Sequence, residues 1–457
     1  MLSLQLSDVA LWTRGNVHGT NVGVHGVFTD TRKPVAGGLF VALRGENFDA
    51  HNFVADAQKA GAAAALVARP VAVDMPQVVV MDTTMALGDL ASAIRAQRRA
   101  RVIGITGSNG KTTVKTLLAS ILSLHGKTHV NAGNLNNEIG LPMSLLNLPT
   151  DAEFAVLEMG AGKHGDIAYL AAIARPEIGL VNNIAPAHLE RMGSLEGIAE
   201  TKGALYTSLP AQGVAVINAD DAFATFFANL AGTRHVIRFG VRGDADVRAE
   251  NIHLSGKTQF ELVTPKGRIE IVLPLNGHHN VQNAIAAVAC AVALDVPIEL
   301  IKRGLESAPS VKGRLQRYAM PGGWTLIDDS YNANPGSTAA AIATLVSEPG
   351  EAWLVLGDMR ELGADARALH AATGKLAHDS GIANLYTVGE LSSAAAKAFG
   401  AKAKHFDTQQ SLAATLAADV KPGVRVLIKG SRGSAMERVV HALRGEGETA
   451  EVACDAA

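Results

Sequence analysis

Cysteine and aromatic residues are scarce in this sequence of 457 residues. There are two cysteines, Cys290 in an apolar helical run and Cys454 in the C-terminal tail. That placement argues against a structural disulfide and fits a reducing compartment. Aromatic residues make up only 4% of the chain, whereas small and aliphatic residues dominate it. Such side chains suit α/β layers in which helices pack closely on sheets.

The sequence also lacks a charge excess of either sign and long hydrophobic runs. The formal net charge is -2, so we expect no nucleic-acid or membrane-surface partner. The N-terminal stretch MLSLQLSDVALWTRG has no basic segment followed by a long apolar run, so it does not resemble a signal peptide. The most apolar helical stretch, residues 284–296, is shorter than the roughly 20 residues that span a bilayer. We therefore expect a cytoplasmic protein without a membrane span.

The stretch VIGITGSNGKTT, which begins at Val102, carries the clearest functional pattern. It predicts a buried strand, a glycine-containing turn and the start of a helix. Backbone N–H groups of such a turn, together with the helix dipole, favour a bound phosphate. Lys111 would reach the β- and γ-phosphates of ATP, and the Thr112 hydroxyl would hold magnesium. The predicted phosphate-binding residues are Gly107, Ser108, Asn109, Gly110, Lys111, Thr112 and Thr113. The strict motif has glycine where Ile105 stands, and the alternative interpretation is an ordinary strand-to-helix turn.

The length predicts about three α/β domains, for which we expect the boundaries 1–83, 84–309 and 310–457. The first unit alternates predicted strands with a helix at residues 53–61. The central unit contains the phosphate-binding turn and ends in an antiparallel appendage at residues 238–273. The third unit has four strands, each followed by a helix, which is typical of a doubly wound sheet. The expected strands are residues 39–43, 63–67, 78–81, 102–105, 154–157, 179–184, 214–220, 324–327, 353–358, 385–389 and 425–430.

Polar side chains follow several of these strands. Glu158 ends the strand 154–157, where a carboxylate can meet magnesium, although a helix cap or a solvated charge is the ordinary alternative. His188 follows the strand 179–184, and Lys202 lies on a predicted helix. Without further context, the ordinary interpretation of His188 is a loop histidine with its hydrogen bonds made, and that of Lys202 is a lysine exposed to solvent. The asparagine-rich segment 131–137 can form a turn or hold a polar ligand.

Taken together, the motifs occur in the order seen in the Mur ligases. They are TGSNGKTT from Thr106, GNLNNEIGLP from Gly133, LEMGA from Leu157, GHHNVQNAIAA from Gly277, GR at Gly313, DDSYNANP from Asp328, LGDMRELG from Leu356 and KGSRGSAME from Lys429. The chain resembles this family over nearly its whole length, including DTR at Asp30 and LFVALRG at Leu39. Ala50 departs from the pattern, because relatives often have glycine there. SYNANP and GDMRELG resemble the branch that acts on D-alanyl-D-alanine.

The resemblance implies an α/β fold of three domains: an N-terminal UDP-sugar-binding domain, a central P-loop ATPase-like domain with a parallel sheet, and a C-terminal Rossmann-like domain. It implies an ATP-dependent ligase that converts a carboxylate to an acyl phosphate, which an amine then attacks. The implied substrates are D-alanyl-D-alanine and UDP-N-acetylmuramoyl-tripeptide, with diaminopimelate or lysine as third residue. The implied cofactor is Mg²⁺ at two sites, and we expect a monomer.

The resemblance also implies residue roles. The catalytic residues would be Lys111, Glu158, His188, Lys202 and Arg314. The metal ligands would be Thr112, Glu158, His188 and Lys202, which in this family can be carbamylated by carbon dioxide. The nucleotide contacts beyond the turn would be Asn280, Asn283, Arg314, Asp329, Tyr331 and Asn334. The substrate contacts would be Asp30, Thr31, Arg32, Asp49, Asn136, Asn137, Lys429, Ser431 and Arg432.

Two alternatives keep the phosphate-binding turn and change the function. One is a ligase for another acceptor, such as a different Mur ligase or a folyl-polyglutamate-type ligase; the asparagine-rich segment and SYNANP argue against it. The other is a P-loop ATPase that couples hydrolysis to motion without forming a bond. That ATPase would release phosphate without any amine.

Overall fold

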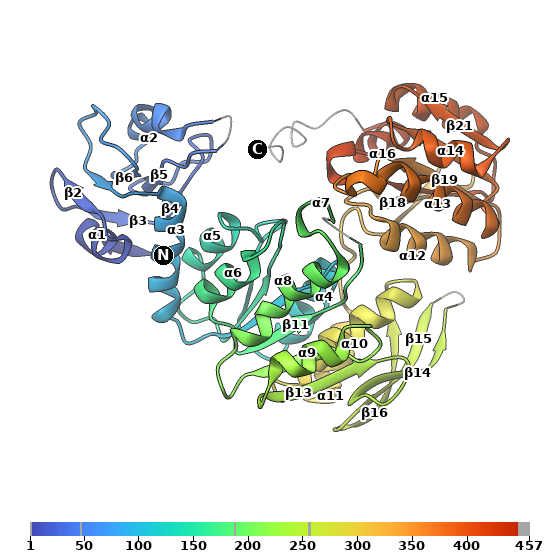
Figure 1. Ribbon diagram of the computed structural model, residues 1–457, viewed down its shortest axis with the longest axis horizontal. Helices are drawn as coiled ribbons and strands as arrows, with labels where there is room; N and C mark the ends of the chain where they lie inside the picture. Colours follow the sequence, from blue (N-terminus) through green and yellow to red (C-terminus); the bar gives the residue numbers. More distant parts are fainter. Residues whose placement is uncertain (1, 46–47, 187–188, 255–256, 447–457) are drawn as a thin grey trace.

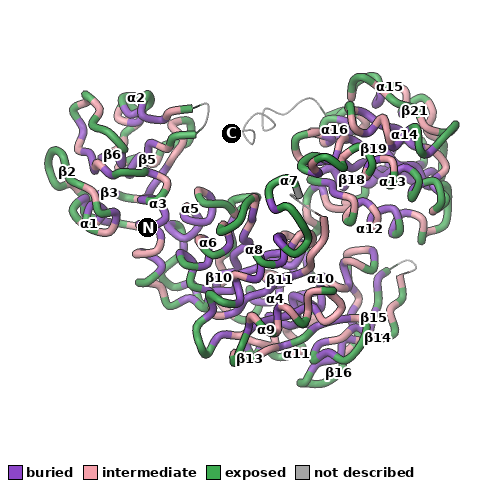
Figure 2. The backbone as a smooth tube through the Cα atoms, viewed as in Figure 1, coloured by how far each residue is buried: buried purple, intermediate pink, exposed green. Residues whose placement is uncertain are grey.

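The computed structural model describes residues 2–45, 48–186, 189–254 and 257–446. The chain forms three parts in sequence order, arranged as an open arc with the middle part at its base (Figure 1). Each part has its own β-sheet covered by helices, and the buried residues lie mainly on the strands and the inner helix faces (Figure 2). Among the described residues no helix is long and apolar enough to cross a membrane. The α/β class is therefore confirmed.

The first part contains a five-stranded sheet. Its order is β2 (Asn16–His18), β7 (Gln77–Val79), β6 (Ala64–Val67), β5 (Leu39–Val41) and β4 (Val27–Phe28), parallel except for the β2–β7 pair. A second, two-stranded sheet pairs β1 (Ser3–Gln5) with β3 (Gly23–His25). Helices α1 (Leu6–Thr13) and α2 (Val54–Lys59) complete this part. The three predicted strands and the helix are confirmed, whereas β1 to β4 were not predicted because they lack the apolar runs found at residues 39–43, 63–67 and 78–81.

Helix α3 (Thr83–Ala96) connects the first and middle parts. The Asp82 carboxylate caps it by accepting hydrogen bonds from the backbone N–H groups of Thr84 and Met85. The helix packs on α1 on one side and on α5 (Gly140–Leu146) and α6 (Asp166–Ala174) on the other. One hydrophobic core thus runs from the first part into the middle part. The domain boundaries themselves remain predictions.

The middle part is a nine-stranded sheet. Its order is β16 (Gly267–Leu273), β15 (Thr258–Thr264), β14 (Val247–His253), β13 (His235–Gly240), β12 (Val214–Asn218), β11 (Ile178–Val181), β8 (Arg101–Thr106), β10 (Phe154–Glu158) and β9 (Thr128–Val130). Strand β8 lies between β10 and β11, which follow it in the chain on opposite sides. Such a switch in strand order opens a crevice at the carboxyl end of β8, where an α/β sheet binds its ligand.

The predicted antiparallel appendage is partly wrong. Strands β14, β15 and β16 pair antiparallel, but they extend the main sheet rather than forming a separate unit. Strand β13 pairs parallel with β12, because helix α9 (Ala224–Ala231) carries the chain back between them. Helices α4 (Lys111–Leu122), α10 (His278–Val292) and α11 (Ile298–Glu306) pack together over one face. Helices α6 and α8 (Leu195–Thr207) pack together over the other, and the short α7 (Leu189–Met192) contacts α8.

The third part is a six-stranded sheet. Its order is β17 (Gln316–Met320), β18 (Trp324–Asp329), β22 (Arg425–Lys429), β19 (Ala352–Gly357), β20 (Asn384–Val388) and β21 (Ala403–Phe406), parallel except for β17. Helices α12 (Pro335–Val346), α13 (Ala366–Asp379) and α14 (Ser393–Phe399) share one core, and α15 (Gln409–Asp419) and α16 (Glu437–Arg444) share another. The doubly wound domain is confirmed, with β17 and β21 added at its edges.

Candidate active site

The turn between β8 and α4 has the geometry of a phosphate cradle. Gly107 and Gly110 have φ of 144° and 81°, a region that favours glycine. A Cβ on Gly110 would collide with the side-chain amides of Asn182 and Asn283. The Lys111 Nζ folds over the turn and donates to the Gly107 carbonyl at 2.8 Å. The turn therefore presents backbone N–H groups and an ammonium at the start of α4.

Two asparagines at the end of β11 hold this turn, and neither was predicted as a site residue. The Asn183 carbonyl accepts from the Ser108 N–H, and its Oδ1 accepts from the Asn109 N–H, both at 2.9 Å. The Asn182 Nδ2 donates to the Asn109 carbonyl, also at 2.9 Å. Both asparagines lie within the predicted strand 179–184, directly after the observed end of β11 at Val181. The two asparagines could therefore be located from the sequence. Their role in holding the turn could not, because it depends on β11 lying beside β8.

Glu158 ends β10 next to the turn and is only 3% exposed. Its Oε2 accepts from the Thr112 hydroxyl at 2.9 Å, and its Oε1 accepts from the Asn136 Nδ2 at 2.8 Å. Burial acts to raise the pKa of Glu158, but the cations Lys111 and Lys115 outweigh it and hold the pKa below its usual value. Glu158 is therefore an ionised carboxylate beside the phosphate cradle.

Two cavities meet at the turn. The first has a volume of about 350 Å³ and the second about 540 Å³. The polar and charged residues that line the first are Asn109, Thr113, Asn182, Asn183, Asn218, Asp220, Asp221, His279, Asn280, Gln282, Asn283, Arg314, Asp329, Ser337 and Lys429. Those that line the second are Ser108, Asn109, Lys111, Thr112, Asn134, Asn136, Asn137, Glu138, Glu158, Lys163, Asp166, Tyr169, Arg191, Arg314, Tyr331, Asn332, Asn334, Ser337, Glu361 and Arg432. Because Asn109, Gly110 and Arg314 line both, a phosphate chain on the turn can pass from one to the other.

Asn280 and Asn283, predicted as nucleotide contacts, both line the first cavity. The Asn283 Oδ1 accepts from the Asn182 Nδ2 at 2.9 Å, and its Nδ2 donates to the Asn280 Oδ1 at 3.3 Å. His279 lines the same cavity and was not predicted, although it belongs to the GHHNVQNAIAA motif. Burial lowers the pKa of His279 to about 4, against the opposing charge of Asp329, so the imidazole is neutral near pH 7.

Arg314 comes from the third part of the chain and reaches the phosphate-binding turn. Its Nη2 donates to the Thr112 Oγ1 at 3.4 Å, and its guanidinium carbon lies 4.5 Å from the centre of the Tyr331 ring. The guanidinium carbon of Arg432 lies 5.9 Å from the same ring. Tyr331, predicted as a nucleotide contact, thus lines the second cavity with two guanidinium groups near its ring.

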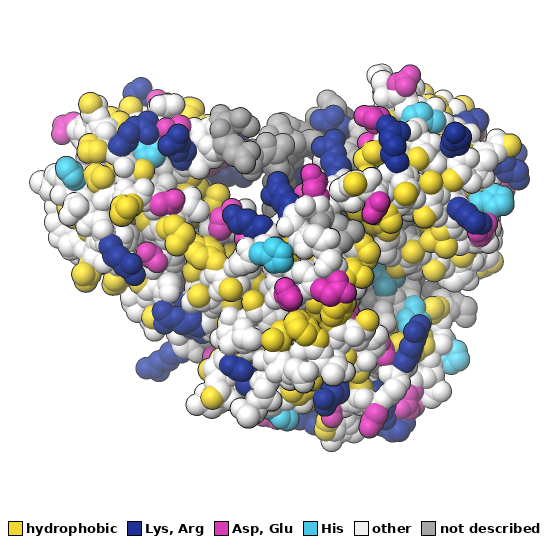
Figure 3. Space-filling model, viewed as in Figure 1, with side chains coloured by type: hydrophobic (Ala, Val, Ile, Leu, Met, Phe, Trp, Pro, Cys, Tyr) yellow, Lys and Arg dark blue, Asp and Glu magenta, His cyan; other side chains and the backbone are white. Residues whose placement is uncertain are grey.

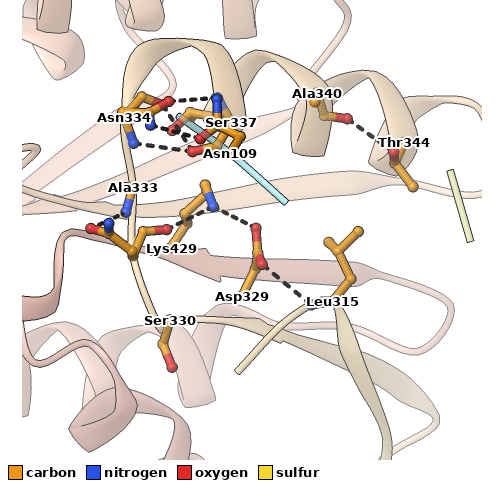
Figure 4. A network of polar contacts seen from close by, with 12 residues as sticks. Asn109, Leu315, Asp329, Ser330, Ala333, Asn334, Ser337, Ala340, Thr344 and Lys429 are labelled. Atoms are coloured by element: carbon orange, nitrogen blue, oxygen red, sulfur yellow. Dashed lines mark hydrogen bonds and ion pairs between the residues drawn. The ribbon is translucent and has the colours of Figure 1, made fainter. Parts of the chain in front are cut away.

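Asn334 makes a second contact between the third part and the turn (Figure 4). Its Oδ1 accepts from the Ser337 N–H at 2.8 Å and caps α12, while its Nδ2 donates to the Asn109 Oδ1 at 2.7 Å. Like Tyr331, it lines the second cavity rather than the first. Asn334 therefore joins the cap of a helix in one part to the phosphate cradle of another.

Replacing Asn334 by serine is expected to lower kcat/KM for ATP by about 5-fold, the value of one lost hydrogen bond. Serine is a good helix cap but is too short to reach Asn109, so the melting temperature should stay close to that of the unmodified protein. Alanine at this position also removes the cap and should cost about 1 kcal/mol of stability in addition. Steady-state kinetics at varied ATP and thermal unfolding of both variants measure the two effects separately. Equal kcat/KM in Asn334→Ser and the unmodified protein would contradict a role for this contact.

Lys429 and Asp329 form a buried ion pair across neighbouring strands. Their Nζ and Oδ2 lie 2.6 Å apart, and Lys429 also donates to the Asn332 carbonyl at 2.9 Å (Figure 4). Both side chains line the first cavity. Ser431 is buried and its hydroxyl donates to the Ala333 carbonyl at 3.1 Å. Of the predicted C-terminal substrate residues, only Arg432 lines the second cavity, among the described residues.

Asn137 lines the second cavity but its side chain has a structural partner. Its Oδ1 accepts from the Gly140 N–H at 2.9 Å, at the start of α5. Asn136, in contrast, directs its amide to Glu158. The structure therefore brings both predicted asparagines to the second cavity and assigns them different contacts.

Lys202 is 2% exposed on α8. Burial, together with the charge of Lys111, lowers the pKa of Lys202 to about 7, against the opposing charge of Asp166. Its side chain makes no hydrogen bond or ion pair with any residue that the structure describes, and it is absent from the described lining of both cavities.

The predicted metal ligand His188 lies outside the described residues. Within the described ranges, no group of three His, Cys, Asp or Glu side chains could hold a metal ion.

The predicted UDP-sugar residues lie on the first part of the chain. Asp30 accepts from the Arg32 Nε at 2.9 Å and Nη2 at 2.8 Å, and Thr31 lies between them in the sequence. Hydrogen bonds from the backbone and ring of His51, with a smaller effect of Arg69, lower the pKa of Asp49 to about 2. These residues follow β4 and β5, at the carboxyl ends of parallel strands. None of them lines either cavity in the described part of the chain, so they form a separate polar edge.

Charged side chains of both signs are interspersed on the face shown in Figure 3. This distribution agrees with the net charge of -2 and gives no extended basic surface on that face.

Comparisons with known proteins agree with this architecture. Family models of a Mur ligase family catalytic domain, a Mur ligase middle domain and a Mur ligase glutamate ligase domain match residues 23–97, 105–291 and 313–432. The chain is 44% identical to the UDP-N-acetylmuramoyl-tripeptide–D-alanyl-D-alanine ligase of Escherichia coli, over 98% of this chain and 100% of that protein. It is 35% identical to the ligase of the same name from Bacillus subtilis, over 95% and 96% of the two chains.

Solved structures show the same similarity. A crystal structure of MurF from Acinetobacter baumannii superposes with a TM-score of 0.93 at 37% identity, covering 98% of this chain and 100% of that one. MurF ligase from Thermotoga maritima in complex with ADP gives a TM-score of 0.83 at 29% identity, covering 93% and 98%. The similarity therefore includes all three parts of the fold.

Proposed function

The chain belongs to the Mur ligase family, and from this premise we infer that it joins D-alanyl-D-alanine to UDP-N-acetylmuramoyl-tripeptide at the expense of ATP. The observation that carries this function is the phosphate-binding turn between two cavities, with Arg314 lining both. One cavity has the size and polar lining for a nucleoside, and the other for a peptide carboxylate and an amine. A P-loop ATPase that hydrolyses ATP without forming a bond would not need the second cavity, because it binds neither a carboxylate nor an amine substrate.

The reaction follows from the residues around the turn. A carboxylate is a poor electrophile, so its oxygen first attacks the γ-phosphorus of ATP, which forms an acyl phosphate and releases ADP. The neutral D-alanyl-D-alanine amine then attacks the acyl carbon, inorganic phosphate leaves with the bonding electron pair, and the amide nitrogen loses a proton that the released phosphate or the solvent takes up. Phosphoryl transfer depends on positioning and on charge neutralisation. Lys111 and Arg314 provide the positive charge at the turn, and the nucleoside would lie in the first cavity beside Asn280 and Asn283.

We propose Mg²⁺ as the cofactor, with Thr112 and Glu158 as ligands of one ion. The described residues fit it, because a hydroxyl and an ionised carboxylate lie 2.9 Å apart beside the turn and hard oxygen donors suit this metal. When bound, Mg²⁺ neutralises charge on the phosphates. A second ion would use Glu158, His188 and a modified Lys202.

The modification that we propose for Lys202 is carbamylation. The lysine is buried, has no partner among the described residues, and has a pKa of about 7, so a large fraction is neutral at physiological pH. A neutral amine can attack carbon dioxide, forming an N–C bond and losing a proton, which leaves an anionic oxygen donor. That product would replace an isolated buried cation by a metal ligand.

The remaining assignments concern the residues that would contact the substrates. Asp30, Thr31, Arg32 and Asp49 would bind the UDP-sugar, and Asn136, Asn137 and Arg432 would face the peptide. We propose a cytoplasmic location, since the acceptor is a nucleotide-linked precursor. We also propose the domain limits 1–83, 84–309 and 310–457, which agree with the separate sheets.

Phosphate release distinguishes the ligase from the alternatives. The purified protein is incubated with ATP and Mg²⁺, with UDP-N-acetylmuramoyl-tripeptide, with D-alanyl-D-alanine, or with both. Sustained release that requires both substrates, together with the pentapeptide product in a mass spectrum, is the expected result. Release with neither substrate would instead indicate an uncoupled ATPase. No release with both substrates, but release in a parallel incubation with another amine or acceptor, would indicate a ligase of different specificity.

A further inference from the structure

Lys115 is a buried lysine that the reaction described above does not use. It lies on α4, one turn after Lys111, and is 5% exposed. Neither cavity includes it among its described lining residues. Any effect of Lys115 on the reaction must therefore act through its neighbours.

The Lys115 ammonium has three oxygen partners on two separate segments. It donates to the Asn131 carbonyl at 2.8 Å and to the Gly133 carbonyl at 3.2 Å. It also lies 3.3 Å from the Glu158 Oε2, with both side chains buried. Because a buried ammonium needs oxygen partners, these contacts hold α4, the asparagine-rich segment and the end of β10 at fixed distances.

Asparagine side chains complete this arrangement. The Asn131 Nδ2 donates to the Glu158 carbonyl at 3.0 Å, and its Oδ1 accepts from the Glu158 N–H at 2.9 Å. Asn136 donates to the Glu158 Oε1 and accepts, through its carbonyl, from the Gly160 N–H, both at 2.8 Å. Glu158 and the segment 131–136 are thus one hydrogen-bonded unit, and Lys115 is the cation inside it.

We propose that Lys115 is a positioning residue for the ligase reaction: it sets the placement of the Glu158 carboxylate and of the asparagine-rich segment that lines the second cavity. Without the ammonium, two buried carbonyls lose a donor and Glu158 loses one of its nearby cations. The segment then shifts relative to the phosphate-binding turn, and small shifts of this kind lower the rate strongly. This inference rests on the proposed function.

Replacing Lys115 by methionine, which keeps the length and removes the charge, tests it. We expect kcat to fall about 10–100-fold and KM for UDP-N-acetylmuramoyl-tripeptide to rise about 10-fold. The dissociation constant for ADP, measured by calorimetry, should stay within about 2-fold, because the described lining of the first cavity contains none of these residues. Lys127→Met is the matched control, since Lys127 is exposed and pairs with Asp151 on the surface; it should leave all three quantities unchanged.

Two results would overturn the proposal. One is a Lys115→Met protein with the kcat and acceptor KM of the unmodified enzyme. The other is a loss of ADP affinity as large as the loss in kcat, which would indicate general damage to the fold. If Lys115→Met does not fold, Lys115→Gln, which keeps a donor for the Asn131 carbonyl, is held to the same criteria. The unmodified enzyme is assayed in parallel, so that an absent ligase activity counts against the proposed function and an unaffected variant counts against Lys115 alone.

Discussion

Replacing Lys111 by alanine is expected to lower kcat by about 1,000-fold, or roughly 4 kcal/mol of transition-state stabilisation. The Lys111 ammonium lies over the phosphate-binding turn, 2.8 Å from the Gly107 carbonyl, where the triphosphate is proposed to bind. Since the migrating phosphoryl group carries negative charge spread over its oxygens, a fixed cation there acts more strongly on the transition state than on bound ATP. The loss should therefore appear mainly in kcat rather than in KM for ATP.

The measurement is the rate of D-alanyl-D-alanine-dependent phosphate release, with Lys127→Ala as the surface control. Thermal unfolding should show that Lys111→Ala is folded, because desolvation lowers the pKa of Lys111 against the opposing charge of Glu158, so the loss of this charge pair is offset by the removal of a desolvated cation. Turnover within a few-fold of the unmodified enzyme would contradict the assignment of the turn as the ATP site. It would also remove the basis for the roles of Thr112, Glu158 and Arg314.

The phosphate cradle could be predicted from the sequence because its signal is local. A strand, a glycine turn and a helix follow one another within a single stretch, and the backbone itself forms the site. The same holds for Glu158, which ends a strand of recognisable composition. The doubly wound third part was predictable for a similar reason, since each strand is followed directly by its helix.

The partners of these residues could not be predicted in the same way. Asn182 and Asn183 hold the turn because β11 lies beside β8, and Lys115 meets Asn131 and Glu158 because β9 and β10 lie next to each other. The sequence contains every one of these residues but not the strand order that places them together. Similarly, Lys429 was predicted as a substrate contact, and its pairing with Asp329 in the first cavity depends on β18 and β22 being neighbours, which the sequence does not show.

Replacing Lys202 by methionine is expected to abolish most activity and at the same time to stabilise the protein. Activity should fall at least about 100-fold, because the carbamate that we propose as a metal ligand cannot form. Stability should rise because methionine fills the same space without placing a cation in an environment that disfavours it. This combination separates a functional lysine from a structural one, since a structural lysine would lose stability when replaced.

The stability gained by Lys202→Met depends on pH, because folding lowers the pKa of Lys202 from 10.5 to about 7. Between these values the unfolded chain binds a proton at this site and the folded protein does not, so the stability of the unmodified protein falls as the pH is lowered. The advantage of Lys202→Met in unfolding free energy should therefore be larger at pH 7 than at pH 9.5, with both proteins in buffer depleted of carbon dioxide. Urea unfolding at the two pH values measures it, and all other titrating groups cancel in the difference. A constant difference, or a less stable variant at pH 7, would mean that Lys202 carries a partnered charge in the folded protein and is not available to carbon dioxide.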